Sequence, residues 1–316
     1  MIRGRTVESR HRVHAAVVDS AGRILQFAGD GGARIYPRSA LKPLQAAAMV
    51  DAGLDLTDPE LLAVSAASHS GEQMHVDAVR RILGSVGLTE SDLGNVPAWP
   101  YDEAVRIGWI ASGGERTRVR MNCSGKHAAM LATCVAAGWP LANYLSPDHP
   151  LQVWLRRWID DLLGEGALAD TITDGCGAPI WTIPLPALAH GFAVLAAGDR
   201  GSAAERVGTA MMSRPEYVGG SHRDVTSLMR GVPGLLAKDG AEGVYAAALP
   251  DGRGLAFKIE DGASRARPAA MAEVLTQLGV PAAELAELRS WEPVLGGGQT
   301  VGEFRVHGQL RRLPGG

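Results

Sequence analysis

The sequence PRSALKP at residues 37–43, followed by an apolar run at 44–50, is the stretch around which the chain is organised. Residues three apart on a helix share a face, so the Lys42 amine can reach the Ser39 hydroxyl. Ser39 also suits the N-cap, where the helix dipole favours anionic chemistry. A lysine that acts as a base needs its pKa lowered from about 10.4 to about 7.5, which takes roughly 4 kcal/mol of desolvation or nearby positive charge. The stretch therefore indicates a serine nucleophile with a lysine base, or a capping serine beside a solvated lysine.

Length and composition are those of an ordinary globular chain. It has 316 residues, 46% hydrophobic and 21% charged, enough for a large core. The net charge of −3, with no basic block, argues against a nucleic-acid surface. No apolar run reaches the roughly 20 residues of a membrane span. The first residues, MIRGRTVE, lack the apolar core of a secretory signal, so we expect a cytoplasmic protein with neither a nucleic-acid nor a membrane partner.

Hydrophobic periodicity predicts strands near both ends and helices between them. Strands are expected at 13–18 and 24–27, joined as a β-hairpin by the turn at 19–22, and at 170–173, 235–238, 244–249, 255–259 and 301–306. Helices are expected after Ser39 and at 58–67, 73–86, 128–137, 150–163 (capped by Asp148), 187–197, 203–212 and 268–278, whereas 94–117 is expected to be loop. No repeat or linker divides the chain. These patterns favour an α+β fold, one domain over 1–316, in which the terminal strands form an antiparallel sheet covered by helices.

Four further clusters gather residues that can carry chemistry: SHSGE at 68–72, CSGKH at 123–127, DGCG at 174–177 and KDGAEG at 238–243. The first can also be a polar helix terminus, and the last a hairpin turn with an exposed lysine. A thiol, an amine and an imidazole within five residues are hard to explain as core filling. Glycines on both sides of Cys176 let the backbone turn sharply and leave its side chain accessible.

The cysteines are too few, and odd in number, for a disulfide framework. Cys123 and Cys176 could together bind a soft metal, for which zinc is the obvious candidate because it favours thiolates. Two cysteines far apart in sequence are a weaker zinc signal than a C-x-x-C pair. Lys126 would join them only as a neutral amine. Cys134 lies inside an apolar helix and is expected to be an inert core residue.

The five motifs, in this order, resemble those of the asparaginase II family. The matching pieces are RSALKP at 38–43, SHSGE at 68–72, NCSGKH at 122–127, DGCG at 174–177 and KDGAEG at 238–243, and the resemblance extends from Val7 to Gln299. Members are amidohydrolases whose fold is related to serine β-lactamases and glutaminases. The resemblance therefore implies a serine acyl-enzyme mechanism and a β-lactamase/glutaminase-like fold.

The resemblance implies two Ser–Lys pairs. Ser39 would be the nucleophile with Lys42 as its base, and Ser68 would pair with Lys238. Lys238, with a glycine two residues on, parallels the lysine-x-glycine strand of serine β-lactamases, whereas Lys258 in FKIEDG at 257–262 competes for that role. The family also implies a homodimer, and a zinc site beside the substrate formed by Cys123, Lys126 and Cys176.

The favoured function is hydrolysis of L-asparagine to L-aspartate and ammonia, with Ser68 and Lys238 relaying a proton to the departing ammonia. The free amino acid carries both charge signs. Asp174 could hold its ammonium and Arg38 its carboxylate, with His127 helping to orient it, or Asp174 and Arg38 could be structural. A glutaminase is an alternative because one methylene changes discrimination by only ~1–3 kcal/mol. A β-lactamase-like acyl transferase and a non-catalytic amino-acid-binding protein are the others.

Overall fold

Six antiparallel strands form the central sheet of the computed structural model, which describes residues 1–312. In sheet order they are β14 (Arg311–Arg312), β4 (Ile24–Ala28), β3 (Val13–Val18), β11 (Gly254–Ile259), β10 (Val244–Ala248) and β9 (Leu236–Gly240). The expected β3–β4 hairpin and the three expected strands between 235 and 259 are confirmed. Strands from both ends of the chain share this sheet, and helices cover it, which confirms the α+β prediction.

The two faces of the sheet differ in side-chain size, and this decides how closely helices approach. Lys238, Ala246 and Ala256 are register partners on one face. Helix α7 (Leu185–Ala197) lies so close to this face that a Cβ on Gly254 would be 2.0 Å from the Ala189 carbonyl oxygen. The other face carries Asp239, Tyr245 and Phe257 in register, and α11 (Arg267–Gln277) covers it.

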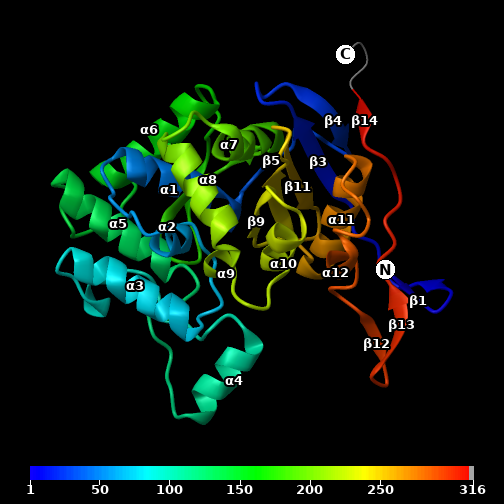
Figure 1. Ribbon diagram of the computed structural model, residues 1–316, viewed down its shortest axis with the longest axis horizontal. Coiled ribbons are helices and arrows are strands. Elements are labelled where there is room, and N and C mark those ends of the chain that lie inside the picture. The colour runs from blue at the N-terminus through cyan, green and yellow to red at the C-terminus, as the bar shows by residue number, and fades with distance from the viewer. Residues whose placement is uncertain (313–316) are drawn as a thin grey trace.

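A helical region lies beside the sheet, on the left in Figure 1. It contains α1 (Lys42–Asp51), α2 (Pro59–Ser65), α3 (Gln73–Ser85), α5 (Ser124–Ala137), α6 (Pro150–Leu163) and α8 (Ala203–Ser213). These helices, together with α7, confirm the expected helical middle of the chain. Every residue of α1 except Asp51 is buried, because α2, α5, α6, α7 and α8 all pack against it. The apolar run after residue 43 is therefore the centre of the helical region.

Shorter elements connect these parts. A second antiparallel sheet has the order β12 (Val294–Gly296), β13 (Gln299–Glu303), β1 (Ile2–Arg3) and β2 (Thr6–Val7), and β5 (Arg34–Ile35) pairs with β8 (Ile183–Pro184), as β6 (Thr171–Thr173) does with β7 (Pro179–Trp181). The short helices are η1 (Arg38–Leu41), η2 (Glu90–Asp92), η3 (Ser264–Ala266), α9 (Pro215–Val218), α10 (Asp224–Gly231) and α12 (Ala286–Arg289). The strand expected at 301–306 is β13, which joins this second sheet rather than the central one.

Two local predictions are wrong. The expected loop at 94–117 contains helix α4 (Glu103–Ala111), whose N-cap Asp102 accepts a hydrogen bond from the Val105 amide. None of its residues is buried, and α4 projects from the body in Figure 1. The sequence therefore carried no pattern of buried apolar residues from which this helix could be predicted. The cap of α6 is the His149 side chain, which accepts from the Leu151 amide, rather than Asp148.

Two further points concern membrane-spanning helices and the number of domains. No helix within residues 1–312 is long and apolar enough to cross a membrane. The expectation of one domain over 1–316 stays a prediction, and its last four residues lie outside the described part of the chain.

The contact of α7 with the sheet predicts the effect of Gly254→Ala. We expect a loss of about 1–3 kcal/mol in the free energy of unfolding, because the added methyl group would collide with backbone that cannot rotate away. The control is Gly108→Ala in exposed α4, where a Cβ meets nothing within 4 Å and should stabilise by about 0.5–1 kcal/mol. Urea unfolding of both variants checks this, and an unchanged midpoint for Gly254→Ala would contradict the packing.

Candidate active site

Ser39 lies in the turn η1, which precedes α1. The expectation that Ser39 is the helix N-cap is wrong, because α1 begins at Lys42 with Leu41 as its cap and Pro43 in its first turn. Arg38 has a φ of +50°, a conformation that costs a non-glycine residue about 1–2 kcal/mol. The turn also abuts the edge of the central sheet, because a Cβ on Gly240 would lie 2.7 Å from the Pro37 carbonyl oxygen. Ser39 is therefore held half-buried between α1 and β9.

Lys42 is buried, and its amine has hydrogen-bond partners other than Ser39. Its Nζ donates to the Ala67 carbonyl oxygen at 2.7 Å, to Ser68 Oγ at 2.9 Å and to Cys123 Sγ at 2.9 Å. Three acceptors match the three protons of an ammonium. Among residues 1–312, Ser39 Oγ has no hydrogen-bond partner, so the expected contact between Ser39 and Lys42 is not formed here. Spacing placed both residues on one helical face, but Ser39 precedes the helix and Lys42 extends into the interior.

Ser68 reaches Lys42 because two other loops hold its segment. The Ser68 amide donates to the Val218 carbonyl oxygen and the His69 amide to that of Asn122, both at 3.0 Å. His69 is fully buried: its Nδ1 accepts from the Gly71 amide, and its Nε2 lies 2.9 Å from Ser124 Oγ. Burial lowers the pKa of His69 well below its usual value, so this imidazole is a neutral structural element.

Lys238 lies on the edge strand β9 with no exposed surface. Its Nζ donates to Asp239 Oδ1 at 2.6 Å and to the Asp239 carbonyl oxygen at 2.8 Å. Burial lowers the pKa of Lys238 to about 8, although the Asp239 carboxylate opposes the shift. In the described part of the chain Lys238 has no hydrogen bond to Ser68, so the expected Ser68–Lys238 pair is replaced by Ser68–Lys42. The competing Lys258 donates to the carbonyl oxygens of Ile259 and Glu260, away from these groups.

Asp239 is the buried charge that sequence reasoning left without a role. Besides Lys238, its carboxylate accepts from Arg223 Nη2 at 2.7 Å and from Arg267 Nη1 at 3.2 Å. Burial alone would raise the pKa of Asp239, but the three cations hold it well below its usual value. A charged residue directly after a lysine on an apolar strand was the available signal, because a buried charge needs partners.

The thiol cluster brings the residues of 123–127 and 174–177 together. The interaction between the two thiols raises the pKa of Cys123 and, together with the nearby Lys126 amine, lowers that of Cys176. Lys126 Nζ donates to Cys176 Sγ at 3.3 Å. Burial alone would lower the pKa of Lys126, but the two sulfurs raise it. His127 Nδ1 lies 2.8 Å from Tyr144 Oη, whereas its buried Nε2 has no hydrogen-bond partner.

This donor set bears on the expected zinc site. Within residues 1–312, no three His, Cys, Asp or Glu side chains are grouped to hold a metal ion. Two sulfurs and the Lys126 amine nevertheless meet in one buried place, and a three-donor set leaves a fourth tetrahedral position open. The residues therefore fit a zinc ion, provided that it displaces the proton of Lys126. Cys134 is buried in α5 outside this cluster, where burial raises its pKa to about 11.

The two residues expected to bind the charged ends of a substrate contact each other. Arg38 Nε donates to Asp174 Oδ1 at 2.7 Å, and the pair is partly exposed. This ion pair holds Arg38 in its strained conformation. No other residue in the described chain accepts a hydrogen bond from the Arg38 guanidinium, so its two Nη groups remain available. The fully buried His127 has no hydrogen bond to either residue.

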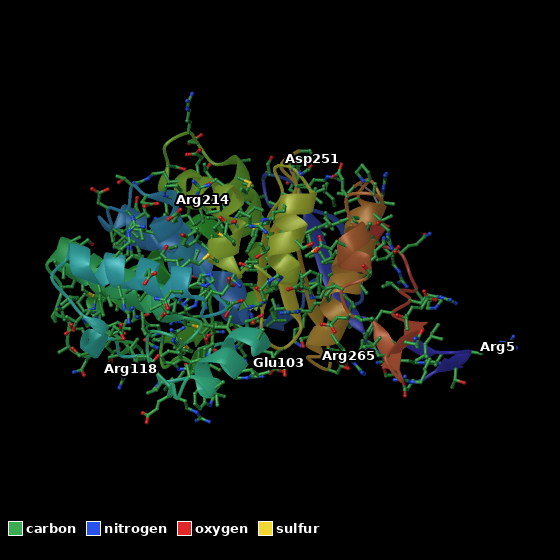
Figure 2. The ribbon with its side chains drawn as sticks, turned by 60° about the horizontal axis from the view of Figure 1, so that its bottom comes forward. Arg5, Glu103, Arg118, Arg214, Asp251 and Arg265 are labelled. Carbon is green, nitrogen blue, oxygen red and sulfur yellow. The ribbon has the colours of Figure 1, made fainter. Side chains whose placement is uncertain are left out.

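The scarcity of lysine in the sequence is a further signal that points to the residues of this site. Only four of the 31 basic Lys and Arg residues are lysines: Lys42, Lys126, Lys238 and Lys258. Three of them are the buried amines described above. The exposed cations are arginines, such as Arg5, Arg118, Arg214 and Arg265 in Figure 2. An amine gives up its proton far more readily than a guanidinium. Three buried lysines in a chain whose exposed cations are arginines therefore favour proton transfer at this site.

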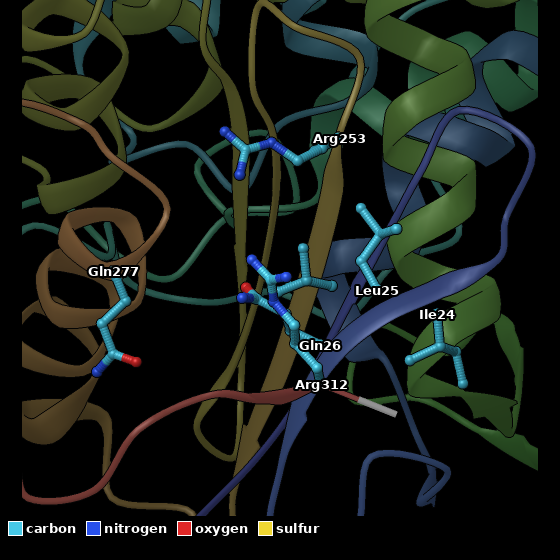
Figure 3. A pocket seen from close by; sticks show the side chains of 7 residues that line it. Ile24, Leu25, Gln26, Arg253, Gln277 and Arg312 are labelled. Carbon is cyan, nitrogen blue, oxygen red and sulfur yellow. The ribbon is translucent and has the colours of Figure 1, made fainter. Parts of the chain in front are cut away.

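Two pockets lie elsewhere on the surface. The larger, about 380 Å³, is lined by residues of β4, β14 and α11 among others, and Figure 3 shows Arg253 and Arg312 among its lining residues. The smaller, about 290 Å³, is lined by residues of α10 and α12 and shares only Arg223 with the network described above. Neither contains a residue that the sequence motifs singled out.

Comparison with known proteins gives one extended match. The model of the family described as L-asparaginase II matches residues 1–306. None of the curated proteins matches the chain. Among solved structures, a β-lactamase candidate from Bacteroides dorei has 15% identity and a TM-score of 0.46, covering 84% of this chain and 94% of its own. A Mycobacterium bovis β-lactamase has 16% identity and a TM-score of 0.38, covering 85% and 96%. The hydrolase EstCE1, with promiscuous acyltransferase activity, has 14% identity and a TM-score of 0.41, covering 87% and 92%.

The lowered pKa of Lys238 predicts how stability depends on pH. Between about pH 8 and the usual value of 10.5, the unfolded lysine keeps its proton while the folded one has lost it. The free energy of unfolding should therefore gain up to about 3 kcal/mol from Lys238 as the pH rises through this window. Urea unfolding of wild type and Lys238→Met at several pH values checks this. A difference between the two proteins that stays constant from pH 7 to 10.5 would show that Lys238 titrates normally.

Proposed function

Because the chain belongs to the L-asparaginase II family, we propose that it hydrolyses L-asparagine to L-aspartate and ammonia through an acyl-enzyme on Ser39. The observation that carries the proposal is the buried ammonium of Lys42 on Ser68 Oγ, at the start of the helix that Ser39 precedes. Two serines and two buried lysines at one junction are the components of proton-coupled serine catalysis. Family membership supports a hydrolase; the acyl-enzyme on Ser39, the roles of the two lysines and the choice of asparagine are the proposal.

The chemical step follows from these groups. Lys42 first releases one proton to solvent, and Ser39 Oγ then attacks the side-chain amide carbon and gives its own proton to the neutral amine. Ser68, which already shares a hydrogen bond with Lys42, passes a proton to the departing nitrogen, so the C–N bond breaks and ammonia leaves. Water then cleaves the ester and returns the proton to Ser39. Ser39 and Lys42 meet in the substrate complex, as catalytic hydrogen bonds often form only there. Lys238, with its pKa near 8, can exchange a proton with this system near neutral pH.

Recognition of the free amino acid is assigned to Arg38 and Asp174. The unused Nη groups of Arg38 suit the substrate carboxylate, and the second oxygen of Asp174 suits the ammonium. Arg38 and Asp174 already pair with each other at 2.7 Å. A ligand with a single charge would therefore gain less binding energy here than a zwitterion, which offers a partner to each of the two side chains. His127 contributes indirectly, because its buried ring packs with the thiol cluster rather than with Arg38.

Zinc is the proposed cofactor, held by Cys123, Lys126 and Cys176 beside the substrate. When bound, it would supply a fixed positive charge that can polarise a substrate oxygen. The chain's own groups carry out the hydrolysis. A homodimer and a cytoplasmic location remain proposals that rest on the family resemblance and on the composition.

The test of the function is ammonia release from L-asparagine and L-glutamine. Ser39→Ala should lower turnover by a factor on the order of 10³ or more, because the nucleophile is removed. The matched control is Ser65→Ala, since Ser65 is buried and bonds only to Leu62 of its own helix. Preferential glutamine cleavage would replace asparaginase by glutaminase. Binding of asparagine without turnover by the wild type would support a non-catalytic amino-acid-binding protein.

Metal analysis tests the cofactor. We expect zinc to copurify with the wild type and to be lost in Cys176→Ser, which removes a thiolate ligand. Cys134→Ser, a buried cysteine outside the cluster, should retain it. Elemental analysis of the three proteins after dialysis gives the zinc content per chain. Equal zinc in all three, or none in the wild type, would exclude the proposed ligands.

A further inference from the structure

The Asp239 carboxylate lies at the centre of the buried charges on the sheet edge. It accepts hydrogen bonds from Lys238, Arg223 and Arg267, whose side chains are all buried. The three cations come from β9, the turn before α10 and the start of α11. The carboxylate therefore links three parts of the chain at one point.

Strand geometry makes the contact between Lys238 and Asp239 unusual. Successive residues of a strand point to opposite faces, so neighbouring side chains normally diverge. The register places Lys238 opposite Ala246, on the α7 face, and Asp239 opposite Tyr245, on the α11 face. The two groups can meet because β9 is the edge strand, so no neighbouring strand separates the two faces of the sheet on that side. The 2.6 Å ion pair thus holds the Lys238 amine at the edge, next to the turn that carries Ser39.

Arg223 extends the same network to the second serine. One of its terminal nitrogens, Nη2, donates to Asp239, and the other, Nη1, donates to the Ser68 carbonyl oxygen at 3.2 Å. The guanidinium also lies 4.5 Å from the centre of the Tyr101 ring. Asp239, Arg223 and Ser68 therefore form a continuous path from the lysine strand to the serine loop.

The charges around Lys238 also show what Asp239 does for it. Asp239 is the anion bonded to its amine, whereas Lys42 and Arg223 are cations nearby. Arg267 reaches the same carboxylate from α11, beside Asp224. Asp224 has one oxygen without a hydrogen-bond partner and makes no contact with Lys238 among the described residues. The two aspartates share the arginines, but only Asp239 contacts the lysine.

We propose that Asp239 is a positioning residue, which fixes the Lys238 amine at the edge of β9 and couples it through Arg223 to the loop that carries Ser68. The expected effect of Asp239 on turnover rests on the proposed function, whereas its expected effect on the titration of Lys238 does not.

The first measurement is independent of activity. Protein labelled with ¹⁵N at lysine Nζ has only four such amines, and Lys238→Met identifies the signal of Lys238. Asp239→Asn removes the negative charge without changing the shape, so it should lower the titration midpoint of Lys238 by about 1–3 pH units. Asp224→Asn removes a buried carboxylate from the same arginines and should leave that midpoint nearly unchanged. Equal shifts in both variants, or none in Asp239→Asn, would overturn the proposal.

The second measurement concerns turnover. Asp239→Asn should lower kcat about tenfold or more and move the pH-dependent limb set by Lys238 to lower pH, while Asp224→Asn should do neither. If Asp239→Asn does not fold, Asp239→Glu keeps the charge and displaces it by one methylene. That variant should retain the limb but lose kcat, and wild-type values of both would reject a positioning role. A wild type that titrates as expected but releases no ammonia would contradict the asparaginase proposal alone.

Discussion

The rest of the site depends on the three hydrogen bonds of the buried Lys42 ammonium. They tie α1 to the end of α2, to the serine loop and to the start of α5. Removing the partners of a buried charge typically costs 3–5 kcal/mol. The loop at 68–72 and the cysteine at 123 are therefore fixed relative to Ser39 by one amine. A side chain at position 42 that cannot donate a proton could fill the same space, but it could neither form these hydrogen bonds nor take part in proton transfer.

Two sets of acceptors bind the buried lysines. The sulfurs of Cys123 and Cys176 lie beside Lys42 and Lys126, whereas Asp239 serves Lys238 together with two arginines. A zinc ion on the sulfurs would contact the first set and not the second. Lys42 lies between them, because its amine binds Cys123 and, besides burial, its charge lowers the pKa of Lys238.

The junction between sheet and helical region is where these sets meet. Gly240 allows η1 to contact the edge of β9, since any side chain there would press on the Pro37 carbonyl group. The strained Arg38 and its ion pair to Asp174 complete the same turn. Ser39 is thus positioned by close backbone packing rather than by its own hydrogen bonds. Backbone packing of this kind holds a serine in place while leaving its hydroxyl free.

The sequence by itself determined the elements and the site composition. Apolar periodicity located the hairpin, the three strands near 238–259 and most helices, because local burial patterns encode them. Residue spacing singled out Ser39 and Lys42 as candidates, the cysteines followed from their residue type, and the family resemblance added the pairing of Ser68 with Lys238. Tertiary structure alone decided the partners: Lys42 binds Ser68 rather than Ser39, and Lys238 binds Asp239. The tertiary structure also decided two elements: β13 joins the second sheet through long-range pairing, and α4 is a helix with no buried residue. The reason is that a long amine can reach several acceptors, and only the packed chain fixes which of them lies within 3 Å.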